Sequence, residues 1–458
     1  MVIKLLSGHS SNNSLIIIFL GWGMDATPFG NISREGHDVA LCYGYDGSSA
    51  EAEQYRSFIK SYTNVYLFAW SYGVAIANSL LDGKEKLAVA INGVVTPKDD
   101  RYGIPQRIFD LTLRSISIEG MQKFYTFTGM TPPFPDRTTD SLKDELSIFG
   151  NITTQTPSEF WDIAYIGTKD RIIPPANQLN LWEEAGVELR RIEGGAHYID
   201  IQSIINENII NKELVRERFT SNTDTYENEA EVQKTVASGL YDRLKKSISR
   251  QLPCPPVILE LGCGTGFLTR LYSSDFDTSR SSVIDIARKE AITSSFERAN
   301  VGFKGEITEG DAEELIHTLP PCCTDVLVSS SAIQWFTNLP RFFSNLERIL
   351  KPGGYAAIAT YIEGTFSNIP GRSLHYYSRD SLLSLVPDSL EVRESSVMTH
   401  TIGFNSPKEL FSHIRNTGVN AVSKTIPPGE MRTLIKQLSA NPSLDFTTLY
   451  LNLQKKYE

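Results

Sequence analysis

The sequence predicts an α/β protein with two domains. Two series of alternating strand-like and helix-like segments follow one another along 458 residues, a length that is generous for one domain. Each series has its own loop between a strand and a helix: YLFAWSYGVAIA (66–77) carries a serine, and VILELGCGTGFLT (257–269) is rich in glycine. We therefore expect one domain over residues 1–207 and another over residues 212–458, both with mainly parallel sheets.

The composition excludes several classes of protein. Hydrophobic residues make up 41% of the chain and charged residues 21%, which is usual for a soluble folded protein. The net charge is −10, and residues 1–210 hold 17 Lys and Arg against 25 Asp and Glu, so the basic excess of a nucleic-acid-binding domain is missing. The longest apolar run, LIIIFL (15–20), is too short to cross a membrane, and the N-terminus lacks a signal-peptide pattern. We expect a cytoplasmic protein.

The cysteines indicate neither a disulfide framework nor a metal site. There are five, an odd number, and none has the C-x-x-C spacing of a zinc site. They are Cys42, Cys254, Cys263, Cys322 and Cys323. We expect ordinary thiols and no bound metal.

A helical insertion interrupts the first series of strands. The sequence predicts strands at residues 15–20, 39–45, 65–70, 87–91, 163–167 and 187–192. Between the fourth and the fifth of these, the segments PQRIFDLTLRSI and TPPFPDRTTD break the alternation. We expect residues 98–157 to form a helical cap over the sheet.

Ser71, Asp170 and His197 are the candidate catalytic residues of the first domain. Each follows a predicted strand, and the order Ser, Asp, His along the chain is that of the α/β-hydrolase fold. Such a site provides a nucleophile, a base that takes its proton and an acid that orients the base. Ala69 replaces the first glycine of the usual G-x-S-x-G pattern, but alanine is small enough for strand and helix to approach closely, and Gly73 keeps the last position.

Two other acids are weaker candidates to orient the histidine. Asp162 adjoins the predicted strand at residues 163–167, and Asp200 is too close in sequence to His197. The oxyanion hole is expected from the backbone N–H of Tyr72, directly after the nucleophile, and from that of Trp22 in the loop FLGWGMD. A packing role of the Trp22 side chain at the mouth of the pocket is equally compatible with the sequence.

Three segments of the first domain resemble the pimeloyl-carrier-protein methyl ester carboxylesterases of biotin synthesis. They are FLGWGMDATPF, AWSYGVA and AINGVVTPKDD, and they resemble in particular the compact variety with a tryptophan-rich oxyanion loop. The similarity covers residues 1–207. It implies that the serine site hydrolyses a methyl ester.

The second domain begins with helical sequence near residue 212. Strand-like runs follow at residues 257–261, 282–286, 303–310, 324–330 and 355–362. Two further β-like stretches, at residues 391–404 and 446–456, flank the predicted helix SPKELFSHIRN.

The glycine-rich loop of this domain favours S-adenosylmethionine over a dinucleotide. Gly262, Gly264 and Gly266 are spaced G-x-G-x-G directly after a strand, whereas a dinucleotide fingerprint needs a glycine where Phe267 stands. Glycines let the backbone approach the methionine part of the cofactor. Glu260, at the end of the strand, can meet the ammonium group of the cofactor or the nearby backbone.

Residues of two later segments complete the expected cofactor site. Asp285 ends the next strand, where a carboxylate can take both ribose hydroxyls. Asp311 and Ala312, in EGDAEEL, are suited to the adenine amino group and ring edge. The segments VLVSSSAIQWF and LKPGGYAAI then follow in the expected order, so we predict the Rossmann-like fold of the class I S-adenosylmethionine-dependent methyltransferases.

The second domain resembles the malonyl-carrier-protein O-methyltransferases, which make the ester that starts the pimeloyl chain. The resemblance is carried by VRERFTSNTDTYENEAEVQ (215–233), ELGCGTG, SAIQWF and FNSPKELFSHIRNTGVNA (404–421). It implies that Tyr226, Gln334 and Trp335 lie on the substrate side. For Tyr226, packing over the cofactor is an equal alternative.

Together the resemblances imply a bifunctional enzyme of biotin synthesis that acts on acyl-carrier-protein thioesters. Because the carrier is acidic, its docking surface should be basic, and Arg107, Arg114 and Lys123 of the predicted cap are candidates, with a solvated helix face as the alternative. Two other interpretations stay open. One is a methyltransferase for another small acid or a quinone fused to a generic esterase, and the other is a non-catalytic hydrolase-like domain that only docks the carrier.

Overall fold

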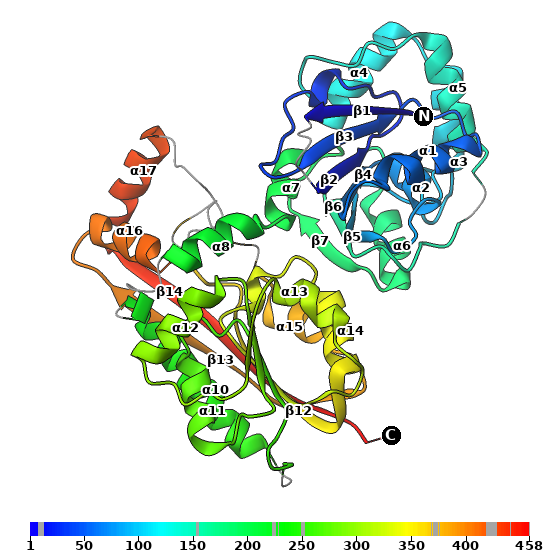
Figure 1. Cartoon of the computed structure of the whole chain (residues 1–458). Helices are drawn as coiled ribbons and strands as arrows, with labels where there is room; N and C mark the ends of the chain where they lie inside the picture. The colour runs from blue at the N-terminus through cyan, green and yellow to red at the C-terminus, as the bar shows by residue number, and fades with distance from the viewer. Residues whose placement is uncertain are drawn as a thin grey trace. The chain divides into compact units, whose positions relative to one another are not determined.

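The computed structural model divides the chain into two compact units, Met1–Asn206 and Glu207–Glu458 (Figure 1). It describes residues 1–7, 13–152, 155–221, 226–227, 229–248, 252–367, 369, 374, 376–417, 428–439 and 441–457. Each unit contains one seven-stranded sheet with helices packed against it, and each is described by itself.

The sheet of the N-terminal unit has the strand order β1-β3-β2-β4-β5-β6-β7. Strands β2 to β7 run parallel to one another, and only β1 is antiparallel to its neighbour. The strands are β1 (Val2–Ser7), β2 (Ser14–Phe19), β3 (Asp38–Tyr43), β4 (Asn64–Trp70), β5 (Glu85–Ile91), β6 (Ile163–Gly167) and β7 (Glu188–Ile192). The six parallel strands lie where the sequence predicts them, but β1 was not predicted.

Nearly every residue of the central strands is buried. The side chains of strands β2, β4 and β5 are buried on both faces of the sheet, which is the pattern of a parallel sheet covered by helices on both sides. The carboxyl ends of the parallel strands meet at one edge of the sheet, and loops at this edge are the usual position for ligands in such sheets.

Three helices lie between β5 and β6, inside the segment where the sequence predicts a cap. They are α3 (Gln106–Arg114), α4 (Ile118–Thr128) and α5 (Thr139–Gly150), and Figure 1 shows α4 and α5 in cyan. The Ser117 and Thr138 side chains cap the first turns of α4 and α5, and Gly129 ends α4 in the left-handed conformation. The other helices of this unit are α1 (Ala50–Ile59), α2 (Gly73–Asn78), α6 (Pro175–Ala185) and α7 (Ile201–Asn208).

The sheet of the C-terminal unit has the strand order β10-β9-β8-β11-β12-β14-β13. Strands β8 to β12 are parallel, and β14 inserts antiparallel between β12 and β13. The strands are β8 (Ile258–Leu261), β9 (Ser282–Asp285), β10 (Glu306–Glu309), β11 (Thr324–Ser330), β12 (Leu350–Tyr361), β13 (Leu390–Gly403) and β14 (Ser443–Lys455). All seven overlap the strand-like runs that the sequence contains.

Alternate residues of these strands enter two cores, one on each face of the sheet. Ile258 and Val326 pack with α10 and α11, whereas their neighbours Leu259 and Leu327 pack with α14. Figure 1 accordingly shows α10, α11 and α12 on one face and α13, α14 and α15 on the other. The helices are α8 (Lys212–Ser221), α10 (Glu231–Ser247), α11 (Phe267–Asp275), α12 (Lys289–Arg298), α13 (Ala312–Leu315), α14 (Leu339–Ile349), α15 (Arg379–Leu383), α16 (Pro407–Asn416) and α17 (Pro428–Leu438).

The described residues hold no candidate for a membrane span or a metal centre. None of their helices combines the length and the apolar character that a membrane span requires. Nor do they contain a group of three or more His, Cys, Asp or Glu side chains placed to hold a metal ion.

Candidate active sites

Ser71 occupies a tight turn between β4 and α2. Its φ angle is +58°, a left-handed conformation that is uncommon for a residue other than glycine. A Cβ atom on Gly73 would lie 2.4 Å from the Phe19 carbonyl oxygen, and one on Gly93 would lie 2.5 Å from that of Ser71. Close approach is therefore required at these glycines, and the strained turn directs the Ser71 hydroxyl into the pocket at the carboxyl edge of the sheet.

The structure brings Ser71, His197 and Asp170 into one hydrogen-bonded chain. His197 Nε2 lies 2.9 Å from Ser71 Oγ, and His197 Nδ1 lies 2.9 Å from Asp170 Oδ2. All three side chains are buried. An ionised carboxylate only accepts hydrogen bonds, so Nδ1 carries the proton and Nε2 is free to accept the serine proton.

Asp170 is fixed by further hydrogen bonds. Its Oδ1 accepts from the backbone N–H groups of Ile172 and Ile173, at 2.8 and 3.1 Å, and its Oδ2 also accepts from Gln178 Nε2 at 2.9 Å. The two other acids are engaged elsewhere. Asp162 accepts from the Ala88 N–H, and Asp200 accepts from the hydroxyl of Ser203 at the start of α7.

Asn92 joins the loops that carry the histidine and the aspartate, and sequence reasoning missed it. Its side chain is fully buried, and its Nδ2 donates to the carbonyl oxygens of Ala196 and His197 at 2.7 and 2.8 Å. Its Oδ1 accepts from the Gly167 N–H at 2.7 Å. The Trp70 indole N–H also donates to the His197 carbonyl, at 2.9 Å. A lone Asn after a strand carries no sequence signal that distinguishes this role from a turn residue.

The loop after β2 passes beside the nucleophile. A Cβ atom on Gly21 would lie only 2.9 Å from the Ser71 Cβ. The next residue is Trp22, and within the described part of the chain neither its backbone N–H nor that of Tyr72 has a hydrogen-bond partner. Both groups are thus available to an oxygen bound near Ser71. The Trp22 indole faces the cap, where its Nε1 donates to the Leu142 carbonyl at 2.8 Å.

Ser71 and His197 open into a largely apolar pocket roofed by the cap. Helix α3 contributes Ile108, Phe109 and Thr112, and helix α4 contributes Phe124 and Phe127. Ile108 and Phe127 are about half exposed, at 51% and 50%, so they mark the mouth of the pocket. Such a pocket is suited to a chain of methylene groups.

The second candidate site lies at the carboxyl end of β8 in the C-terminal unit. Gly262, Gly264 and Gly266 all have positive φ angles, of 74°, 52° and 91°. A Cβ atom on Gly262 would lie 2.3 Å from the Ala332 Cβ, whereas one on Gly264 would meet no atom within 4 Å. Gly262 is thus needed for packing, and Gly264 presents its backbone to the pocket that it lines.

Two buried carboxylates line the same pocket. Glu260 Oε2 accepts from the hydroxyls of Thr269 and Tyr272, at 2.7 and 2.9 Å, and burial raises the pKa of Glu260 to about 7. Asp285 accepts from the backbone N–H groups of Gly264 and Ala287, one on each oxygen. The Cys263 thiol and the Ile286 N–H also bond to Asp285, so its carboxylate is firmly held in the lining of the pocket.

Asp311 and Ala312 line the pocket at the start of α13. Asp311 caps this helix. Lys212 Nζ donates to Asp311 at 3.3 Å and to Glu313 at 2.9 Å. Sequence reasoning missed Lys212, a pocket-lining residue of α8. A lysine in a charged helix gives no signal that it turns toward two acids far along the chain.

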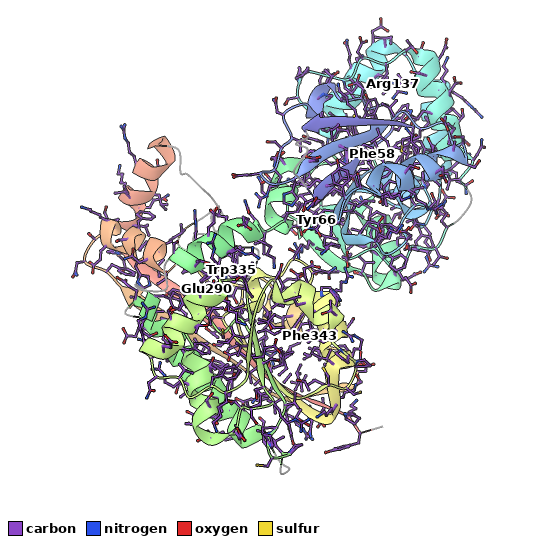
Figure 2. All side chains as sticks on the ribbon, in the orientation of Figure 1. Phe58, Tyr66, Arg137, Glu290, Trp335 and Phe343 are labelled. Carbon is purple, nitrogen blue, oxygen red and sulfur yellow. The ribbon has the colours of Figure 1, made fainter. Side chains whose placement is uncertain are left out.

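The three residues expected on the substrate side are placed differently from one another. Tyr226 and Trp335 line the pocket, and Tyr226 stacks on Phe267 at 5.9 Å between ring centres. Trp335, labelled in Figure 2, packs edge to face against Phe219 of α8. Gln334 does not line this pocket, because its amide bonds to the Ser331 carbonyl at 2.6 Å and to the Thr360 hydroxyl at 3.3 Å.

Two further polar side chains of the pocket were not predicted. Gln233, on α10, is 5% exposed and lines the pocket. Thr265, inside the glycine loop, has a buried hydroxyl without a hydrogen-bond partner among the described residues. Both can bond to a polar ligand in the pocket.

Comparison with known proteins assigns the chain to a family. A malonyl-[acyl-carrier protein] O-methyltransferase of Bacteroides fragilis is 31% identical over 426 residues, and the match spans 88% of this chain and 84% of that protein. This chain belongs to the malonyl-[acyl-carrier protein] O-methyltransferase family. A second protein of that name, from Bacteroides thetaiotaomicron, is 29% identical over 47% of this chain and 80% of its own length.

Both units of this O-methyltransferase family member match family models. Residues 3–203 match the pimeloyl-ACP methyl esterase BioG model, and residues 259–358 match a methyltransferase domain. The crystal structure of BioG from Haemophilus influenzae is 31% identical and covers 43% of this chain and 94% of its own, with a TM-score of 0.37. The chain is therefore an enzyme with a methyl esterase domain and a methyltransferase domain.

S-adenosylmethionine is the cofactor of this O-methyltransferase family member. The pocket fits it on three counts. Gly264 offers backbone without a side chain in the way, Asp285 places a buried carboxylate in the lining, and the Thr265 hydroxyl lacks a partner within the described structure.

Proposed function

We propose that the chain is a bifunctional, cytoplasmic enzyme of biotin synthesis. Its C-terminal domain, over residues 212–458, would methylate the free carboxylate of malonyl-[acyl-carrier protein]. Its N-terminal domain, over residues 1–207, would have the α/β-hydrolase fold and hydrolyse the methyl ester of the pimeloyl-[acyl-carrier protein]. The observation that carries the proposal is the complete Ser71–His197–Asp170 chain in the same polypeptide as the cofactor pocket.

Ester hydrolysis would follow from the hydrogen-bond chain. Ser71 Oγ attacks the ester carbonyl carbon while its proton passes to His197 Nε2, and Asp170 stabilises the imidazolium. The N–H groups of Trp22 and Tyr72 stabilise the oxyanion. When the C–O bond to the methoxy group breaks, His197 gives the proton to the methoxy oxygen, and methanol leaves. Water then attacks the acyl-serine by the same route, releasing the free acid and Ser71.

Methyl transfer to a carboxylate would need no general base from the protein. S-adenosylmethionine supplies an electrophilic methyl group when bound. A carboxyl group with a pKa of roughly 4 is already ionised at neutral pH, so no residue has to remove a proton from the substrate. The remaining tasks are to orient the carboxylate and to exclude water, and the rings of Tyr226, Trp335 and Phe219 at the pocket supply apolar walls for this.

One experiment tests both activities. Each loaded carrier is incubated with the enzyme and followed by mass spectrometry of the intact carrier. We expect a gain of one methyl group on malonyl carrier with S-adenosylmethionine, and loss of one methyl group from pimeloyl methyl ester carrier without it. Methylation of free small acids or quinones instead of the carrier would favour the alternative methyltransferase. Absence of demethylation would favour a non-catalytic N-terminal domain.

The esterase should strongly prefer the pimeloyl ester to the malonyl ester on the carrier. Four additional methylenes at about 0.8 kcal/mol each give roughly 3 kcal/mol, or about 200-fold, in an apolar pocket. If the carrier docks on the cap, a chain that is four carbons shorter also ends about 5 Å short of Ser71. We expect the ratio of kcat/KM values to exceed about 200 on the carrier and to be smaller for free methyl esters. Comparable values for both carrier-bound esters would contradict this.

The mouth of the esterase pocket is the proposed docking surface for the acidic carrier. Arg107 and Arg114 of α3 and Lys123 of α4 are exposed, and they share these two helices with Ile108 and Phe127 of the mouth. Basic side chains around an apolar opening complement an acidic partner that must insert an acyl arm.

Charge reversal at this surface should separate carrier from small substrates. For the double variant Arg107→Glu and Arg114→Glu we expect kcat/KM for pimeloyl methyl ester carrier to fall by about 10-fold or more at low salt, because exposed charges act mainly on association. Hydrolysis of a short free methyl ester should be unchanged. The matched control is Arg56→Glu on α1, outside the cap. An equal loss for carrier and free ester would place the effect in the fold rather than in docking.

A further inference from the structure

The loop that carries Trp22 is held by the cap. The Trp22 indole N–H donates to the Leu142 carbonyl of α5 at 2.8 Å, and the Tyr125 hydroxyl of α4 donates to the Gly23 carbonyl at 2.8 Å. Gly23 has a φ angle of +74°, and a Cβ atom there would lie 2.9 Å from the Leu142 side chain. The loop and the two cap helices thus form one packed unit.

A single buried carboxylate of α5 joins this loop to the next strand end. Glu145 is 2% exposed, and its Oε2 accepts from the Gly23 N–H at 2.9 Å while its Oε1 accepts from the Tyr45 N–H at 3.0 Å. Arg137, labelled in Figure 2, lies 3.4 Å from Oε2 and donates to the Met24 carbonyl at 2.9 Å. The Gly23 N–H, the Gly23 carbonyl and the Met24 carbonyl are therefore each held by a side chain of the cap.

We propose that Glu145 is a positioning residue for ester hydrolysis, because it fixes the peptide next to the Trp22 N–H and so aims that donor at the oxyanion. The inference rests on the proposed esterase function. The Gly23 N–H belongs to the peptide between Trp22 and Gly23. Only the two backbone torsions of Trp22 separate this peptide from the one that carries the Trp22 N–H, so fixing the first restricts the direction of the second. An oxyanion donor acts only when it is fixed in advance, and a displacement of about 1 Å can cost about 100-fold in rate.

A carboxylate suits this position better than its amide. The two oxygens of Glu145 accept from different backbone N–H groups, one from Gly23 and the other from Tyr45. A glutamine has one acceptor oxygen, and its amide group would face the second N–H as a donor against a donor. The loop must then shift to relieve this contact, although size and shape stay the same.

The test compares Glu145→Gln with Asp144→Asn, the same change one residue earlier, where the side chain is exposed. The substrate is a short free methyl ester, which avoids carrier docking. For E145Q we expect kcat to fall about 10- to 100-fold with KM changed less than about 3-fold. For D144N we expect no change, and methyl transfer should be unchanged in both variants.

A second readout separates positioning from general damage to the fold. A trifluoromethyl ketone that forms a tetrahedral adduct with Ser71 should bind E145Q more weakly by the same factor as kcat falls. The unreactive alcohol of the same shape should bind as in the wild type. Equal losses for ketone and alcohol, or a folded E145Q with unchanged kcat, would overturn the inference.

A milder variant keeps the inference testable should E145Q fail to fold. Tyr125→Phe removes one hydroxyl that donates to the Gly23 carbonyl, and we expect a smaller loss of kcat, about 3- to 10-fold, again without loss of alcohol binding. An unchanged kcat in this variant would count against the loop as the point of action. If the wild type hydrolyses no methyl ester at all, the proposed function itself fails, which is a different outcome.

Discussion

Replacing Ser71 with alanine is expected to abolish ester hydrolysis and to leave methyl transfer at the wild-type rate. The hydroxyl of Ser71 is the proposed nucleophile, 2.9 Å from the histidine that takes its proton, and alanine has no atom that can replace it. Loss of such a nucleophile costs about 10⁶-fold in kcat in other Ser-His-Asp enzymes. The cofactor pocket belongs to the other compact unit, so its chemistry has no use for Ser71. Mass spectrometry of both loaded carriers measures the two activities in one preparation.

A double variant makes this test stricter. Residues that act as one catalytic unit lose activity non-additively, so S71A combined with His197→Ala should be no slower than S71A alone. Ser79→Ala, at the far end of α2, is the matched control and should keep full activity. Esterase turnover of S71A above about 1% of the wild type would remove Ser71 from the proposed role, whatever happens to methyl transfer.

The sequence predicts the fold well where one local pattern decides the structure. The central parallel strands carry apolar runs that are buried almost throughout, and they appear at the predicted positions in both units because helices cover both faces of each sheet. The edge strand β1 was missed because Val2, Lys4 and Leu5 are exposed, and its short apolar run therefore resembles any surface segment.

The candidate site residues were predictable where their positions follow from the order of strands. Ser71, Asp170 and His197 each follow a parallel strand, so they meet at one sheet edge, and the same holds for Glu260 and Asp285. The hydrogen-bond partners that hold these side chains, such as Gln178 for Asp170 and Thr269 for Glu260, were not predictable.

Residues that hold a site from a distance left no pattern in the sequence. Glu145 lies in an amphipathic cap helix, where an acid normally faces solvent, but here it contacts a loop more than a hundred residues earlier, with a separation of 122 to Gly23. Asn92 and Lys212 act over comparable separations, of 75 to Gly167 and 99 to Asp311. Gln334 was expected on the substrate side but does not line the pocket. Sequence alone could not show that its amide bonds to Ser331 and Thr360 instead.

Replacing Gly264 with valine is expected to remove cofactor binding while the esterase stays active. Gly264 has a φ angle of +52°, which costs a side chain roughly 1 to 2 kcal/mol, and a β-branched residue tolerates it least. No protein atom lies within 4 Å of the position of a Cβ at Gly264, which lines the pocket, so the valine side chain would occupy space that the cofactor needs. We expect the affinity for S-adenosylmethionine to fall by about 100-fold or more in isothermal titration calorimetry.

The matched control for this variant is Gly302→Val. A Cβ atom on Gly302 would also meet no atom within 4 Å, but the φ angle of this residue lies outside the left-handed range and it does not line the pocket. The control should bind the cofactor as the wild type does.

Gly264→Ala separates backbone strain from the loss of cofactor space. Alanine has most of the strain of valine at this φ angle, but its methyl group fills less of the pocket. We expect its affinity for S-adenosylmethionine to lie between that of the wild type and that of the valine variant. Ester hydrolysis in each variant reports that the N-terminal unit has folded. A folded G264V with unchanged affinity would show that the backbone at Gly264 does not approach the cofactor, and the glycine loop would then be a packing feature of the strand end.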